Sequence, residues 1–318
     1  MENEGWDSPI SRMLGVKYPI ILGAMRQITL GDMAAAVSAA GGFGQVAASG
    51  MDADELRAEL SRAIAATHRP VGVNIPVYRP NALEALEIAV EMGVRAITTS
   101  AGNPAKIMGR ARAAGLVVLH KVSTVAMAKK AAAAGVDAII AMGFEAGGHV
   151  GRENITTLCL VPQVVDAVDI PVVAAGGIAD ARGVAAAFAL GASGVELGTR
   201  FVATAECPVP GFFKDRLVAA ACDATLLLGK EAMPIRVLRN QVTELVSGMR
   251  QAEADDAMVS AGDAAYVQSG GTAETAVMPC GQIAGLVGGE KTVAQVMEEL
   301  VSGVGPLLAA MGRVFGCK

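Results

Sequence analysis

Short apolar runs alternate with longer, alanine-rich segments from residue 17 to about residue 205. The runs lack a regular alternation of polar and apolar residues, which is typical of parallel strands that are buried on both faces of a sheet. The eight predicted strands lie at residues 19–22, 43–46, 70–75, 95–99, 116–121, 138–142, 170–175 and 194–197.

The segments between these runs carry helix signals. Asp52 stands where an N-cap would begin a helix at 51–67, and Gly135 ends the helical segment before the sixth strand. Eight strand and helix units predict an α/β protein with a closed (β/α)8 barrel, the TIM-barrel architecture. A doubly wound open sheet is the alternative.

The repeat breaks after Phe201. We expect a barrel formed by residues 1–205 plus 285–318, and a small, mostly helical insertion at 206–284 that covers the active face. Within the insertion, residues 253–275 are small and polar, which indicates a loop or a lid. An amphipathic helix at 292–315 is expected to pack back on the barrel.

Composition narrows the class of protein. Aromatic residues make up 3% of the 318 residues and the net charge is −5, which argues against nucleic-acid binding. No run of about 18 uninterrupted apolar residues occurs, so we expect no membrane span. The acidic N-terminus lacks a signal-peptide pattern, and the five cysteines form no CxxC pair. These features predict a cytoplasmic protein with reduced thiols.

Polar and glycine-rich positions follow the predicted strands. In a (β/α)8 barrel the carboxyl ends of the strands meet at one face, where such enzymes place their chemistry. The positions concerned are Gly23–Met25, Asn74, Ser100–Gly102, His120–Lys121, 143–151, Gly176–Gly177 and Gly198–Thr199. We therefore expect one active site at this face.

The loop at 143–151 is the strongest catalytic candidate. It holds four glycines in nine residues, together with His149, one of three histidines in the chain. A flexible backbone beside a group that titrates near neutral pH suits acid–base catalysis. The alternative is a glycine-rich turn with an incidental histidine. Glu145, in the same loop, either binds ligand or orients the loop, and an isolated carboxylate is more often structural.

Two turns suit a phosphate group. Ala175-Gly176-Gly177 and Gly198-Thr199 follow the seventh and eighth predicted strands, where barrels often bind phosphate with backbone N–H groups. Thr199 would add a hydroxyl donor. The alternative is two ordinary tight turns. Lys121 either contacts an anionic cofactor or extends its side chain to solvent.

Other candidates are weaker. Gly41-Gly42-Phe43-Gly44 precedes a strand, so it fails the context of a dinucleotide-binding motif. The three histidines are too dispersed to predict a metal site, and we expect none. Arg236 and its neighbours Arg239 and Asn240 are expected on a solvated helix face, with binding of an acidic substrate as the alternative. Cys159 is expected to be buried.

Several motifs together resemble one family. They are Gly23-Ala24-Met25, Gly72-Val73-Asn74, Thr99–Pro104, Glu145–Gly151, Ala174–Asp180, Gly198–Phe201 and Gly281–Leu286. With these motifs the chain resembles the FMN-dependent nitronate monooxygenase (2-nitropropane dioxygenase-like) family, which includes FMN-dependent enoyl-acyl-carrier-protein reductases of bacteria.

The resemblance implies FMN as cofactor and His149 as the acid/base residue. It implies that the phosphate lies on Gly176-Gly177 and Gly198-Thr199, with the isoalloxazine near His149. The full set of residues expected to bind the cofactor is Gly23, Ala24, Met25, Asn74, Ser100, Lys121, Glu145, Gly147, Gly148, Ala175, Gly176, Gly177, Gly198, Thr199 and Gln282. Ala24 departs from the glycine usual at its position, which bears on the choice of substrate.

Three functions follow from these observations. The enoyl reductase branch is favoured by three segments, Asn74–Pro76, Ser100–Pro104 and Gly281–Gly285. In that function NADH or NADPH is the reductant, and the substrate is an acyl thioester, for example one carried on acyl carrier protein. The second function is oxidation of alkyl nitronates with O₂. The third is a flavin-free barrel that acts as an isomerase, a lyase or a ligand binder. A homodimer is also a candidate state.

Overall fold

Eight parallel strands form a nearly closed barrel in the computed structural model of the protein, which describes residues 5–229, 234–249, 253 and 271–316. The strands are β1 (Ile20–Leu22), β2 (Gly44–Ala47), β3 (Val71–Pro76), β4 (Ala96–Ser100), β5 (Val117–Val122), β6 (Ala138–Met142), β8 (Val172–Ala175) and β9 (Gly194–Leu197). They lie in the order β1-β9-β8-β6-β5-β4-β3-β2, and a parallel bridge between Ile21 and Phe43 closes the ring. The predicted barrel is confirmed.

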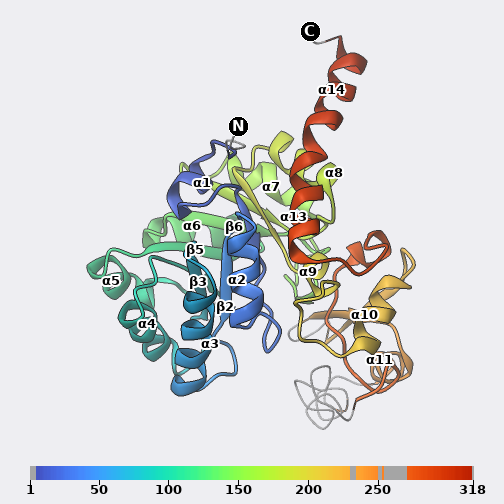
Figure 1. Ribbon diagram of the computed structural model, residues 1–318, viewed down its shortest axis with the longest axis horizontal. Helices are drawn as coiled ribbons and strands as arrows, with labels where there is room; N and C mark the ends of the chain where they lie inside the picture. Colours follow the sequence, from blue (N-terminus) through green and yellow to red (C-terminus); the bar gives the residue numbers. More distant parts are fainter. Residues whose placement is uncertain (1–4, 230–233, 250–252, 254–270, 317–318) are drawn as a thin grey trace.

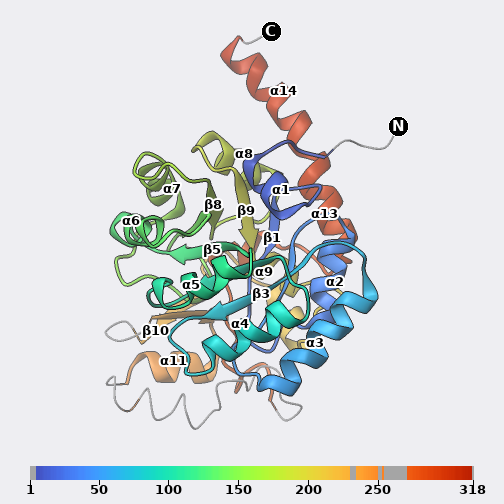
Figure 2. The same cartoon turned by 90° about the vertical axis from the view of Figure 1, so that its left-hand side faces the viewer.

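Helices cover the outside of the barrel (Figure 2). They are α2 (Gly31–Ala39), α3 (Ala53–Ala66), α4 (Ala82–Glu91), α5 (Ala105–Ala113), α6 (Val125–Ala134), α7 (Thr157–Val165), α8 (Ala181–Ala189) and α9 (Thr199–Val202). The remaining N-terminal helix, α1 (Pro9–Leu14), packs instead at one end of the barrel. The expected N-cap at Asp52 forms a reciprocal capping box with Glu55, and Gly135 ends α6 in a left-handed conformation with φ of 88°. Local sequence signals therefore set these helix ends.

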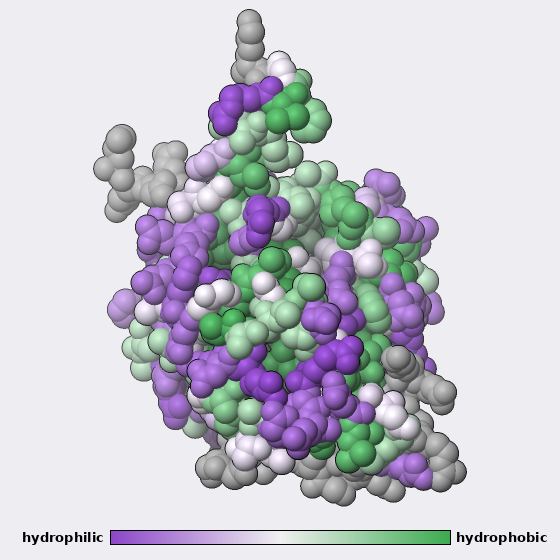
Figure 3. All heavy atoms as spheres, turned by 90° about the vertical axis from the view of Figure 1, so that its right-hand side faces the viewer, coloured by the Kyte–Doolittle hydropathy of each residue, from purple (hydrophilic) through white to green (hydrophobic). Residues whose placement is uncertain are grey.

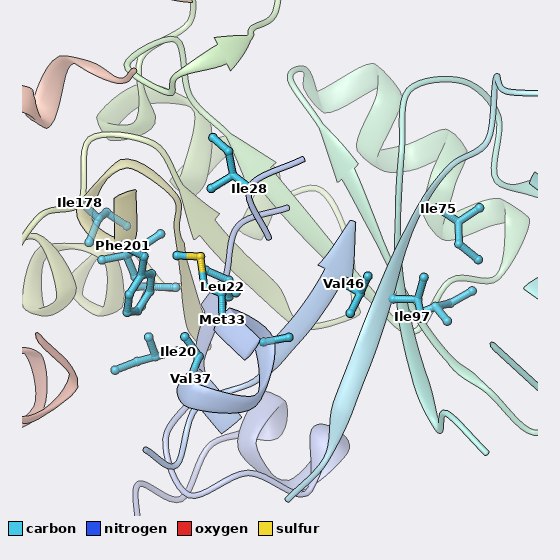
Figure 4. Packing of buried hydrophobic residues seen from close by; sticks show 14 of the residues in the cluster. Ile20, Leu22, Ile28, Met33, Val37, Val46, Ile75, Ile97, Ile178 and Phe201 are labelled. Atoms are coloured by element: carbon cyan, nitrogen blue, oxygen red, sulfur yellow. The ribbon is translucent and has the colours of Figure 1, made fainter. Parts of the chain in front are cut away.

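The core has two layers because side chains alternate between the two faces of each barrel strand. Outward-facing side chains such as Leu22 pack with Phe201 and the helices in the larger cluster (Figure 4). Inward-facing side chains such as Ile21 and Ile140 form a second cluster, to which α1 contributes Ile10. Apolar side chains thus fill the barrel on the side of α1, and the opposite end is left for polar groups.

The chain after β9 forms an added unit at the end of the barrel away from α1 (Figure 2). It contains α10 (Gly211–Val218), β10 (Thr225–Leu228), β11 (Ile235–Leu238), α11 (Gln241–Ser247) and the 3₁₀ helix η1 (Gln282–Leu286). The expectation of a mostly helical insertion at 206–284 missed both strands.

The two missed strands belong to a three-stranded sheet that no repeat in the sequence predicts. They pair antiparallel, and β11 pairs in turn with β7 (Gly148–His149), which lies far earlier in the chain. A two-residue strand carries too little pattern to be recognised, and its partner is remote. The expected loop or lid at 253–275 falls largely outside the described residues, and the domain boundaries stay a prediction.

The expected helix at 292–315 is divided at Gly303 into α13 (Val293–Ser302) and α14 (Val304–Phe315). The first half packs as predicted, since α13 buries Val293, Val296 and Leu300 among others. The second half differs, because α14 buries no residue and extends away from the barrel (Figure 1), leaving apolar side chains exposed on the upper part of the molecule (Figure 3).

The two C-terminal helices also bear on membrane association. Val293–Phe315 is the one described stretch that is long and apolar enough to cross a membrane by length and composition. A single such helix is weak evidence, and its first half, α13, packs one face against α2 and α8. The stretch is therefore weak support for a membrane span.

Candidate active site

A layer of polar side chains lines the barrel interior on the side opposite α1. Thr98 Oγ1 donates to Gln45 Oε1 at 2.5 Å, and Asn74 Nδ2 donates to Thr98 Oγ1 at 2.8 Å. Gln45 Nε2 in turn donates to the carbonyl of Leu22 at 2.7 Å. All three side chains are buried. Neighbouring strands thus hold Asn74, a predicted cofactor-binding residue, in one fixed orientation.

A buried ion pair completes this layer. Lys121 Nζ, on β5, lies 2.5 Å from Glu196 Oε1, on β9, and the two side chains are 14% and 4% exposed. Lys121 therefore does not extend to solvent, which was the alternative to a role at the cofactor. The second oxygen, Glu196 Oε2, is buried and has no hydrogen-bond partner within the described part of the chain. Glu196 was not predicted as a site residue, since an isolated glutamate in an apolar run gives little signal.

The loop that follows β6 is fixed by three other segments. Gly143 N donates to Ala175 O at 2.9 Å, and Phe144 N donates to Ile155 O at 2.8 Å. Gln282 N, from η1, donates to Glu145 O at 2.9 Å. The loop is therefore bound both to the barrel and to the added unit.

The Glu145 carboxylate caps helix α7. Both of its oxygens accept from Thr157 N, at 3.0 and 2.9 Å, and Oε2 also accepts from Thr157 Oγ1 at 3.0 Å. The Glu145 side chain therefore orients the loop, which was one of the two roles expected for it. An ionised carboxylate accepts hydrogen bonds and repels anions, so this side chain is poorly suited to bind a phosphate. Contact of Glu145 with a cofactor stays a prediction.

The two predicted phosphate turns meet the His149 loop. Gly176 and Gly177 have φ of 91° and 72°, a left-handed conformation that favours glycine. A Cβ on Gly176 would lie 3.0 Å from Gly143 O. A Cβ on Gly147 would lie 2.5 Å from Gly281 N. Gly281 N donates to Thr199 Oγ1 at 2.9 Å, so that hydroxyl already has a protein partner. The structure brings these loops into contact.

The first motif joins the same cluster. Gly23 N donates to Leu197 O at 2.8 Å, and a Cβ on Gly23 would lie 3.2 Å from the backbone of Gly198. Met25 Sδ would lie 3.5 Å from a Cβ on Gly198. Ala24 is partly exposed in this turn. Ser100 lies at the end of β4, and its carbonyl accepts from Val77 N, away from these contacts.

His149 lies on β7, where it is opposite Ile235 of β11, and its side chain is exposed. Gln282 is also exposed, beside the same loop. An exposed imidazole on a fixed backbone is accessible to a substrate and to solvent protons, as acid–base catalysis requires. Among the described residues no group of three or more His, Cys, Asp or Glu side chains could hold a metal ion.

His120 has a structural place that the sequence did not indicate. It is 2% exposed, and its Nδ1 lies 2.7 Å from Thr99 Oγ1. Burial lowers the pKa of His120 to about 4, although a backbone hydrogen bond with Gly102 opposes the shift. The imidazole is therefore neutral at pH 7 and tethers the loop after β4, in which Ala101 has φ of 49°.

The expected position of Arg236 on a solvated helix face was wrong. It lies on strand β11 and is 4% exposed, rather than on a solvated helix face. Arg239 is exposed and donates to Asp223 O, and Asn240 caps α11. The available signal for a strand was the short run of β-branched and apolar residues around it, Ile235-Arg236-Val237-Leu238. Cys159, expected to be buried, is exposed on α7.

Comparison with known proteins agrees with this geometry. The sequence model of the nitronate monooxygenase family matches residues 7–303, and the chain belongs to that family. FabK from Thermotoga maritima has a similar structure, with a TM-score of 0.91 and 36% identity over 96% of this chain and 98% of that one. Nitroalkane oxidase from Streptomyces ansochromogenes has a TM-score of 0.77 and 28% identity over 95% of this chain and 99% of that one.

The name of a third relative includes a CoA thioester. The chain is 38% identical over 248 residues to the (3aS,4S,5R,7aS)-5-hydroxy-7a-methyl-1-oxo-octahydro-1H-indene-4-carboxyl-CoA dehydrogenase of Mycobacterium tuberculosis, covering 76% of this chain and 69% of that protein. The protein is therefore an oxidoreductase of the nitronate monooxygenase family, whose members depend in general on FMN. The predicted family and enzyme class are confirmed.

The residues present fit FMN. The turn at Gly176-Gly177 offers backbone rather than side chains, which lets a phosphate group approach closely. The inner layer offers Asn74, Lys121 and the unpartnered acceptor Glu196 Oε2, which suit a ring edge that carries both hydrogen-bond donors and acceptors.

Proposed function

We propose that the protein reduces 2-enoyl thioesters with electrons from NADH or NADPH, and that it holds FMN at the face described above. The observation that carries the proposal is the similarity to FabK, an enoyl-acyl-carrier-protein reductase, which spans 96% of the chain and includes the added unit. The CoA thioester in the name of the mycobacterial relative supports the same substrate class.

Each group of residues has a task in this proposal. The turns at Gly176-Gly177 and Gly198-Thr199 bind the phosphate, and Asn74 and Lys121 orient the ring. FMN, when bound, supplies hydride chemistry between the nicotinamide and the substrate. His149, exposed on β7, donates the proton that completes saturation of the double bond.

A second candidate is the oxidation of alkyl nitronates with O₂. It is supported by the family match and by the similarity to nitroalkane oxidase. In this function His149 would manage the proton on the carbon that bears the nitro group. Family membership argues against the third function, a flavin-free barrel. A purified protein that is colourless and takes up no FMN would support that alternative.

One anaerobic experiment separates the two candidates. The protein is loaded with FMN and mixed without oxygen with NADPH, NADH or an alkyl nitronate, while flavin absorbance is recorded. We expect rapid bleaching by a nicotinamide and reoxidation by a 2-enoyl thioester. Bleaching by nitronate alone would overturn the reductase proposal and support the second candidate.

We further propose a cytoplasmic location, a homodimer as a candidate state and acyl carrier protein as a candidate partner. The four described cysteines, Cys159, Cys207, Cys222 and Cys280, are free, which fits a reducing compartment. Sedimentation of the purified protein and of its mixture with acylated carrier protein would test the two assemblies.

A further inference from the structure

We propose that Arg236 is a positioning residue, which holds the His149 loop in register from the added unit. The proposal rests on the function proposed above, in which His149 is the acid/base group. Arg236 would not touch the substrate or the cofactor. It would act through the backbone of residues 144–148.

The register of His149 is set by the strand that carries Arg236. In the β11–β7 pairing, Arg236 is opposite Gly148 and Ile235 is opposite His149. Val150 N also donates to Pro234 O at 3.0 Å. Within the described part of the chain β7 is the edge strand of the order β10-β11-β7, so β11 is the strand that defines its position. A shift of β11 would therefore move the imidazole.

The Arg236 side chain reaches the other end of the same loop. Its Cζ lies 4.7 Å from the centre of the Phe144 ring, and its Nε and Nη2 donate to Phe144 O at 3.3 and 3.0 Å. Nη1 donates to Thr225 Oγ1 of β10 at 3.5 Å. One residue thus binds the loop at position 148 through its backbone and at position 144 through its guanidinium.

The chemistry of these contacts requires arginine. The planar guanidinium can stack on the Phe144 ring and donate two N–H groups to one carbonyl, which an ammonium cannot do in one geometry. Burial lowers the pKa of Arg236, and attraction to Glu145 opposes that shift. Glu145 is itself held by Thr157 and Gln282. The buried cation therefore belongs to the set of contacts that hold this loop.

The test compares Arg236→Met and Arg236→Lys with the matched control Arg239→Met, an exposed arginine three residues further on. We measure kcat, KM for the enoyl thioester, FMN affinity by fluorescence and the pH profile of kcat. A displacement of about 1 Å can cost about 100-fold in rate. We expect Arg236→Met to lower kcat by about 10- to 100-fold, with FMN affinity changed less than about 3-fold, and Arg236→Lys to restore part of the rate.

The pH profile separates positioning from a purely structural role. A displaced imidazole meets a different environment, so the limb of the kcat profile that His149 controls should shift in Arg236→Met and not in Arg239→Met. Unchanged kcat and pH profile in a folded Arg236→Met variant would overturn the proposal. If that variant does not fold, Arg236→Lys and Phe144→Leu give the same test, since each removes part of the contact.

A parallel His149→Ala variant distinguishes the two levels of inference. If His149→Ala keeps full turnover, the proposed function of the histidine is wrong, and a positioning role for Arg236 falls with it. If His149→Ala loses turnover and the folded Arg236 variants do not, only the positioning role is overturned.

Discussion

The barrel and the three-stranded sheet hold polar groups in different ways. In the barrel, Asn74 and Lys121 lie on long strands, buried, with hydrogen-bond or ion-pair partners on other barrel strands. In the small sheet, His149 lies on a strand of two residues, exposed, and its position depends on a remote strand. The barrel thus provides a fixed layer, and the added unit holds the loop whose exposed histidine we propose as the proton donor.

This difference suits the two tasks of a flavin oxidoreductase. A cofactor that stays bound gains from partners that are fixed before it arrives, because no ordering cost is then incurred. A proton donor must reach both substrate and solvent, so it needs exposure as well as correct placement. The comparison predicts that substitutions in the small sheet mainly affect turnover, whereas those in the barrel mainly affect stability.

The largest effect should come from His149→Ala. General acid–base groups contribute about 10²- to 10⁴-fold to rate, so we expect kcat to fall by that range while FMN stays bound. Steady-state kinetics and flavin fluorescence measure both quantities. His68→Ala, a change at another exposed histidine, is the matched control. Unchanged turnover in His149→Ala would contradict its role.

In the barrel, Glu196→Leu should be the most destabilising change. It leaves the buried Lys121 ammonium without its partner, which typically costs about 3–5 kcal/mol in the free energy of unfolding. Urea unfolding of the cofactor-free protein measures the loss.

The double variant Lys121→Met with Glu196→Leu is the control, since it removes both charges, and it should recover most of the stability. By comparison, Glu87→Gln at the exposed pair with Arg110 should leave stability unchanged. An equal loss in the single and double variants would show that packing, not charge, holds this position.

The comparison also explains what the sequence could predict. Barrel strands, helix ends such as Asp52 and Gly135, and the face that carries the site follow from short-range patterns, because each unit repeats the same local physics. These features are accessible without knowledge of contacts.

The remaining features depend on partners far along the chain. Arg236 is buried because it lies on the central strand of the small sheet and against Phe144, 92 residues earlier, and Glu145 is a helix cap because Thr157 follows the loop. The apolar pattern continues past Gly303, yet α13 buries one face and α14 buries no residue. Nothing in the local pattern of these residues distinguishes such outcomes from a solvated face or a ligand contact.

His120 makes a pH-dependent prediction for the barrel. Its pKa is about 4 in the folded protein and about 6.5 when unfolded, so between these values the unfolded state binds more protons. The free energy of unfolding should therefore fall as pH falls through this window, by up to about 3 kcal/mol from this group.

Urea unfolding between pH 7 and pH 4 measures this slope, and His120→Leu should remove the part that the imidazole contributes. Carboxylates titrate in the same window, so the difference between the natural chain and the variant is the quantity to compare. His68→Leu, at an exposed histidine, is the control and should keep the full slope. Identical slopes in all three proteins would show that His120 is protonated as readily in the folded state.

The smallest effects should come from two helix caps, and they compare the two regions directly. Asp52 caps α3 on the outside of the barrel, and Glu145 caps α7 from within the His149 loop. Loss of a cap typically costs about 1 kcal/mol of stability, so Asp52→Ala and Glu145→Ala should destabilise the protein by similar amounts. Only Glu145→Ala should also lower kcat, by several-fold, because its carboxylate anchors the loop that carries His149 to Thr157. If both variants leave kcat unchanged, the Glu145 carboxylate has no part in catalysis, and the other contacts of the loop suffice to hold the histidine.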